Sequence, residues 1–213
     1  MEFESFKNSI KKFVQFADLD LEKLTAIAEE KVAQEIEESR MNGIYIAPPP
    51  TTDPHGKGYE PVEIIETRCT IPISMVCFSV IDFIGSLLTR DKTDNEKDSF
   101  LLHSRLFFQQ VLERNDLDNP DSLKEFQNFY RHSIMHSYLP KSNMGIGFAV
   151  SYTYYLLSEA LFERSYQGLT ILNIRYLAKC TRQGLSIIKS SIENRNELAQ
   201  KLFEQYAKMI EDT

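Results

Sequence analysis

The sequence predicts a mainly α-helical protein, a helical bundle with a small antiparallel β-hairpin or meander inserted before a long C-terminal helix. Apolar residues recur at intervals of three and four along much of the chain, which is the helical period. This period changes to two between residues 146 and 155, as expected for a strand. Hydrophobic residues make up 42% of the 213 residues and charged residues 26%, which excludes a disordered or fibrous protein.

The chain divides into three parts that we expect to form one compact unit. Its length suits a single domain with its own core. A cluster of prolines and glycines separates the first helices from the rest of the chain and predicts a long loop. The expected parts are N-terminal helices at residues 1–42, a Pro/Gly-rich loop at 43–69, and a helical domain at 70–213 with its β insertion at about 146–172.

Two helices are expected before the loop. The segment from Glu2 to Phe16 places aromatic residues on one face at helical spacing. Asp18 or Asp20 can cap a second helix, and Asn42-Gly43 offers a left-handed stop for it.

The helices of the main domain have local start and stop signals. Asn119-Pro120, with Ser122 and Glu125 spaced as a capping box, predicts one helix start, and Pro140 must end that helix at or before Leu139. Other signals predict a central helix from Ile73 to Leu88, a helix that ends near Arg114, and a last helix from about Asn173 to Glu211, broken near Gly184 or Asn194.

The β insertion is expected to be antiparallel. Apolar residues alternate with smaller or polar ones from Ile146 to Tyr155. A partner strand around Leu161 and Phe162, a turn near Gly168 and a short extended run from Leu169 to Leu172 complete the predicted hairpin or meander.

Composition also indicates where the protein works. The three cysteines, Cys69, Cys77 and Cys180, lie in mostly apolar surroundings, which suits buried thiols in a reducing compartment. The start of the chain has no export signal, and Asp82 interrupts the most apolar stretch, so a buried helix explains that stretch better than a membrane span. We therefore expect a cytoplasmic protein without a membrane partner.

Charge is distributed unevenly along the chain. The formal charge is −7, yet the segment from Phe126 to Ile192 holds seven basic and only two acidic residues. Such a segment suits binding to an RNA backbone, and the alternatives are an ordinary solvated face or a contact with the acidic surface of a partner. The tyrosines at 152, 154 and 155 are expected mostly in the core. The candidate RNA-binding residues are Lys141 and a basic stripe on the last helix formed by Arg175, Lys179, Arg182 and Lys189.

Two of the four histidines lie within five residues of each other on the helix that Pro140 ends. Arg131 is followed by the polar His132 and, after four intervening residues, by His136. This pattern resembles the Arg-x4-6-His motif of the HEPN family (higher eukaryotes and prokaryotes nucleotide-binding domain), whose members are helical bundles with the motif near the end of a late helix. The resemblance covers roughly residues 70 to 210.

The resemblance implies metal-independent endoribonuclease activity of a toxin or defence type, in a homodimer and without a cofactor or metal. Arg131 would hold the phosphate, His136 would act as general acid or base, and His132 would assist. A protein antitoxin is a further partner implied by the family. On an ideal helix Arg131 and His136 lie about 140° apart. Either the arginine side chain wraps round the helix, or the last turn departs from ideal geometry before Pro140, or the site is completed across a dimer, which is the option that the resemblance implies.

Three other interpretations of these residues remain open. The histidines and the arginine can be structural groups at a helix end. His132 and His136 share a helix side and could bind a metal, although no third ligand is evident. The whole segment could also belong to a non-catalytic interaction module that binds a partner protein or a nucleotide. A Ser-His-Asp or Cys-His nucleophile lacks the necessary sequence motifs.

Overall fold

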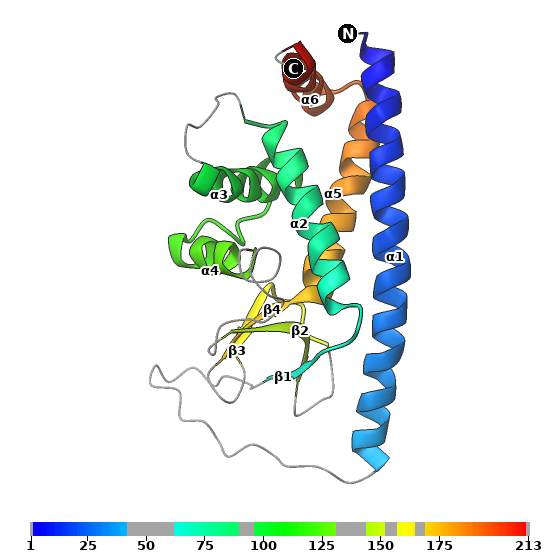
Figure 1. Cartoon of the computed structure of the whole chain (residues 1–213), viewed down its shortest axis with the longest axis vertical. Helices are drawn as coiled ribbons and strands as arrows, with labels where there is room; N and C mark the ends of the chain where they lie inside the picture. Colours follow the sequence, from blue (N-terminus) through cyan, green and yellow to red (C-terminus); the bar gives the residue numbers. More distant parts are fainter. Residues whose placement is uncertain are drawn as a thin grey trace. The chain divides into compact units, whose positions relative to one another are not determined.

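The computed structural model describes residues 2–41, 62–89, 96–130, 144–151, 157–164 and 169–211. Within these ranges the protein is mostly helical, with a small mixed β-sheet, as the sequence predicts at this level (Figure 1). The elements are α1 (Phe3–Met41), β1 (Val62–Ile65), α2 (Thr70–Ser86), α3 (Glu96–Leu106), the π-helix η1 (Phe107–Val111), α4 (Pro120–Tyr130), β2 (Met144–Ser151), β3 (Phe162–Arg164), β4 (Thr170–Asn173), α5 (Ile174–Asn194) and α6 (Glu197–Glu211).

Helix α1 is one continuous helix where two were expected (Figure 1). No glycine or proline lies within it, and one buried face runs through the position of the expected break. Asp18 does not act as a cap there, because its carboxylate accepts a hydrogen bond from Arg182 at 2.7 Å. The buried face consists of Phe6, Ile10, Val14, Ala17, Leu21, Ala28 and Val32.

Helix α3 passes directly into the π-helix η1. The wider turn is closed by a hydrogen bond from the Leu112 N–H to the Phe107 carbonyl, 3.3 Å long. The helix then ends at Glu113, which has a φ of 53°, while the Arg114 N–H donates to the Phe108 carbonyl at 2.9 Å. This bond spans one residue more than the corresponding bond of a Schellman motif, as expected after a π-helix, and like that motif it uses a left-handed residue.

The start of α4 and the break in the long C-terminal helix lie close to the predicted points. Asn119 caps α4, since its side-chain oxygen accepts a hydrogen bond from the Asp121 N–H at 2.9 Å. The long C-terminal helix is interrupted after Asn194, where Arg195 has a φ of 50°. Gly184 does not break the helix. A Cβ at this glycine would lie 2.4 Å from the Phe107 ring, so the position allows close packing.

The sheet corrects the predicted antiparallel hairpin or meander. Its strand order is β1-β2-β4-β3. β2 pairs antiparallel with β1 but parallel with β4, and β3 pairs antiparallel with β4. β1 comes from residues expected to belong to the Pro/Gly-rich loop. Every residue of β2 from Met144 to Val150 is buried, so neither face of this part of the strand is exposed to solvent.

The chain forms two compact units, each assembled from separate segments. Unit 1 contains residues 1–22, 76–128 and 179–213, and unit 2 contains residues 23–75 and 129–178. The core of unit 1 is aromatic, with the Phe126 ring 5.2 Å from that of Phe78 and 5.9 Å from that of Phe100. In unit 2, Ile64 packs on the sheet residues Ala149 and Ile171.

Candidate functional site

The predicted catalytic segment follows α4 directly and precedes β2. Arg131, His132, His136 and Lys141 lie outside the described residues. The described part of α4 reaches Tyr130, the residue immediately before Arg131. Tyr152, Tyr154 and Tyr155 also lie outside the described part of the chain. The immediate surroundings of the motif that the structure describes are therefore α4 on one side and β2 on the other.

Helix α4 is fixed on its apolar face by two phenylalanines. Phe126 and Phe129 have no exposed surface. Phe126 belongs to the aromatic core of unit 1, and in unit 2 the Phe129 ring stacks on Phe162 with 6.1 Å between centroids. Large buried rings of this kind contribute several kcal/mol to a fold. The chain thus enters the Arg131 segment from a well-anchored residue.

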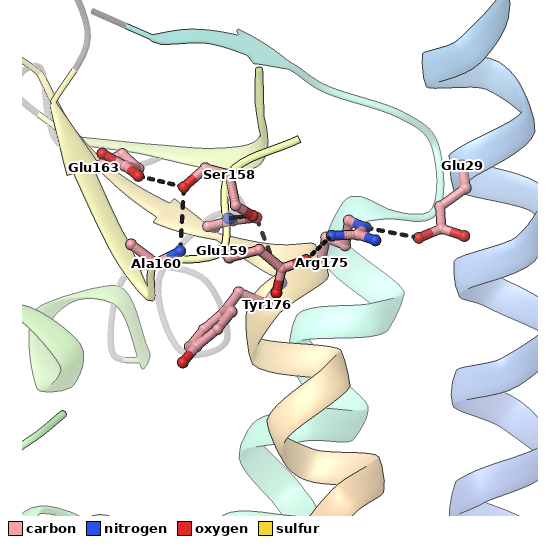
Figure 2. A network of polar contacts seen from close by, with 8 residues as sticks. Glu29, Ser158, Glu159, Ala160, Glu163, Arg175 and Tyr176 are labelled. Atoms are coloured by element: carbon pink, nitrogen blue, oxygen red, sulfur yellow. Dashed lines mark hydrogen bonds and ion pairs between the residues drawn. The ribbon is translucent and has the colours of Figure 1, made fainter. Parts of the chain in front are cut away.

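Arg175, the first residue of the predicted basic stripe, lies between two carboxylates of its own chain (Figure 2). Its Nε donates to Glu29 of α1 at 2.9 Å, and its Nη1 donates to Glu159 at 2.7 Å. Burial lowers the pKa of the Arg175 guanidinium, but the hydrogen bonds to Glu159 and Glu29 outweigh this effect, so its pKa lies above the usual value. Two carboxylates against one guanidinium leave this group of three side chains with a formal negative charge.

A hydrogen-bond network holds the segment that carries Glu159 (Figure 2). The Ser158 hydroxyl donates to Glu163 of β3 and accepts from the Ala160 N–H at 3.1 Å. The buried Asn173 side chain donates to the Ser158 carbonyl at 2.9 Å. The carboxylate of Glu159 is therefore presented to Arg175 by a segment that is itself constrained.

Arg182 is also paired within the chain. Its Nε lies 2.7 Å from Asp18, and its Nη2 lies 3.9 Å from Glu22, both on α1. The hydrogen bond to Asp18 raises the pKa of the guanidinium. Two of the four predicted stripe residues thus pair with carboxylates of their own chain, an arrangement that the sequence did not predict. Lys179 and Lys189 are exposed on the same helix.

A second polar contact was not predicted as a pair. The Nδ1 atom of His103 on α3 lies 2.8 Å from Oδ1 of Asp82 on α2. The His103 side chain retains 14% of its exposure and that of Asp82 retains 42%. The available signal was Asp82 itself, since an acidic residue within an apolar helix needs a polar partner or solvent. An imidazole beside a carboxylate can transfer protons, but the contact is equally suited to joining two helices.

Unit 2 also contains a cavity of about 530 Å³ beside the start of α2. Ile27 and Lys31 of α1 line it together with Arg68 and Cys69.

The thiols of Cys77 and Cys180 are buried, and burial raises the pKa of the Cys77 thiol to about 12. A neutral, enclosed thiol is a poor nucleophile, so Cys77 suits a structural role.

No group of three or more His, Cys, Asp or Glu side chains among the described residues is placed to hold a metal ion. None of the helices in the described ranges has an apolar stretch long enough to cross a lipid bilayer.

The fold defines a mostly helical protein with a small mixed sheet. Comparison with models of known protein families, with curated proteins and with solved structures found no match.

Proposed function

We propose that this protein is a HEPN-like, metal-independent endoribonuclease of a toxin or defence type. The observation that carries the proposal is the sequence Arg131, His132 and His136, which begins at the residue after α4. It is supported by the mostly helical fold and by the scarcity of histidine elsewhere, since two of only four lie here. A homodimer that completes the site belongs to the same proposal.

The chemistry requires three groups. A base removes the proton of a ribose 2′-hydroxyl, and the resulting oxygen attacks the adjacent phosphorus. A cation stabilises the charge that develops on the phosphate, and an acid protonates the 5′-oxygen as its bond to phosphorus breaks. In this proposal Arg131 supplies the cation, while His136 and His132 supply the base and the acid. The products are a 2′,3′-cyclic phosphate and a 5′-hydroxyl.

The test is cleavage of RNA by the purified protein in excess chelator. We expect His136→Ala and Arg131→Ala to lose at least about a hundredfold in rate, the usual cost of removing a proton-transfer group or a preorganised charge. His55→Ala is the matched histidine control and should retain full activity. Products that end in a 2′,3′-cyclic phosphate support the mechanism. Equal cleavage by the wild type and His136→Ala would identify a contaminating nuclease and exclude the proposed one.

A non-catalytic interaction module is the second candidate. It is favoured by the ion pairs of Arg175 and Arg182 with the chain's own carboxylates, because they reduce the charge available for RNA. Titration with a fluorescent RNA at several salt concentrations distinguishes the two candidates. RNA held by Lys179 and Lys189 should bind with a salt dependence that becomes shallower by about 0.7 for each lysine replaced by glutamine. RNA affinity that is unmeasurable at low salt would favour the interaction module.

A further inference from the structure

The cavity of unit 2 has two walls, helix α1 and the segment that joins β1 to α2. Ile27, Lys31 and Glu35 line it from α1, and residues 66–69 line it from the joining segment. Its volume of about 530 Å³ falls in the range of pockets that hold small molecules. All the lining residues belong to unit 2, so the site does not depend on unit 1.

Hydrogen bonds between neighbouring residues fix the joining segment. The Thr67 N–H donates to the Thr70 hydroxyl at 2.9 Å, and the Cys69 N–H donates to the Thr67 hydroxyl at 3.2 Å. The Thr70 N–H in turn donates to the Thr67 carbonyl at 3.1 Å. The other wall is a regular helix. Both walls are therefore formed without a ligand, as is usual for small-molecule sites.

Each wall of the cavity carries one cation and one carboxylate. Lys31 and Glu35 lie on α1, and Arg68 and Glu66 lie on the joining segment. Lys31 donates a hydrogen bond to the neutral Gln34 side chain at 2.9 Å. In the part of the chain that the structure describes, none of the four charged groups has an ion-pair partner. Both signs of charge are therefore available to a ligand.

The lining indicates a ligand that has both signs of charge and an apolar part. A polyanion such as RNA would meet two carboxylates in this cavity, and a polycation would meet two cations. The side chain of Ile27 is 53% exposed, and an apolar group placed against it would bury that surface. Ile27 and Glu35 are eight residues apart, which is about 12 Å along a helix. A free amino acid is shorter than this distance, whereas an extended peptide of three residues spans about 10 Å.

We propose that this cavity binds a short peptide, about three residues long, with free termini and an apolar side chain. The planar guanidinium of Arg68 binds the terminal carboxylate through two donors. Glu35 accepts hydrogen bonds from the terminal ammonium, and Ile27 contacts the apolar side chain. The cavity lining does not include residues 131–136, so the inference does not depend on nuclease activity.

Isothermal titration calorimetry of the full chain with the tripeptide alanyl-alanyl-leucine tests the proposal. The comparison ligands are the same tripeptide with an acetylated amino end, the same tripeptide with an amidated carboxyl end, and free leucine. Each cap removes one charge-assisted contact, so each should raise the dissociation constant about tenfold. Free leucine cannot reach from Glu35 to Ile27 and should also bind about tenfold more weakly.

Two variants identify the groups that bind the peptide termini. Arg68→Gln should weaken binding of the free tripeptide about tenfold and leave binding of the amidated tripeptide unchanged. Glu35→Gln should likewise weaken binding of the free tripeptide and leave binding of the acetylated tripeptide unchanged. Arg105→Gln is the matched control, because it makes the same change at an exposed position of α3 in unit 1, and it should bind as the wild type does.

Cys69 provides a second measurement, because its partly exposed thiol lines the cavity whereas Cys77 and Cys180 are buried. Bound tripeptide should slow the alkylation of Cys69 by iodoacetamide, which peptide mapping by mass spectrometry measures. The proposal would be overturned by the absence of both heat and protection at millimolar tripeptide, or by equal affinity for the free and capped peptides. An Arg68→Gln variant that still distinguishes the free from the amidated tripeptide would also overturn it.

Discussion

The imidazole of His103 on α3 lies against the carboxylate of Asp82 on α2, with 2.8 Å between Nδ1 and Oδ1. The contact supplies a polar partner to Asp82, within a helix that is otherwise apolar. We predict that Asp82→Ala and His103→Ala each destabilise the protein and that the double variant is less destabilised than the sum of the two. The coupling should be about 1 kcal/mol, since the pair is partly exposed.

Urea unfolding of the four proteins in this double-mutant cycle measures the coupling. Arg105→Ala, an exposed position on α3, is the control and should change stability little. Strictly additive losses would show that the two side chains stabilise the fold independently of their contact.

Replacement of Arg175 by methionine is predicted to destabilise the protein by about 1 kcal/mol, because Glu29 and Glu159 lose their shared cation. The expected loss of stability is small because the side chain of Glu159 is 53% exposed and that of Glu29 is 42% exposed. Lys189→Met removes a cation from an exposed position of the same helix and should have almost no effect. Chemical denaturation of both variants makes the comparison, and equal losses would contradict the proposed role of the two carboxylates.

Glycine at position 113 is predicted to stabilise the protein. Glu113 has a φ of 53°, in the left-handed region where a side chain is unfavourable. Glu113→Gly should raise the free energy of unfolding by about 0.5–1 kcal/mol. Glu113→Ala, which keeps a Cβ atom, should give no such gain. The thermal midpoints of the two variants test this directly, and a higher midpoint for alanine would exclude a conformational cause.

Alkaline pH is predicted to destabilise the fold through Cys77. Burial holds the pKa of this thiol near 12 in the folded state, against an ordinary value of 9.0. The unfolded thiol therefore loses its proton first, so its contribution to stability is complete below pH 9.0 and decreases toward pH 12. Cys77→Ala should show a weaker loss of stability than the wild type as pH rises above 9.0. Parallel pH profiles in urea unfolding would show that other groups cause the whole effect.

The elements that could be predicted are those whose signals lie within a few residues. The start of α4 follows from Asn119 and Pro120, and the break between α5 and α6 follows the predicted Asn194. Strand β2 was predicted from its alternating side chains. Pairing could not be predicted in the same way, because the parallel register of Gly147 with Asn173 depends on contacts between separate segments. The continuity of α1 likewise depends on the buried face that its partners cover.

The same distinction between local signals and contacts of distant residues applies to the candidate site. The Arg131–His136 motif is local and can be found by spacing alone. The partners of Arg175 could not be identified from spacing, because Glu29 is 146 residues away in the chain. Basic residues on one helical stripe look alike in a sequence, and only the fold shows that Arg175 and Arg182 contact acidic side chains.

The long separation of these ion pairs has a consequence for synthesis on the ribosome. Glu29 is translated 146 residues before Arg175, and Asp18 is translated 164 residues before Arg182. Helix α1 therefore leaves the exit tunnel well before the arginines that neutralise its acidic side exist. During that interval its apolar face is not yet covered, and this face includes Phe6, whose ring packs against Phe203 of α6. The nascent chain should consequently be most prone to aggregation, and most dependent on chaperones, until α5 has emerged.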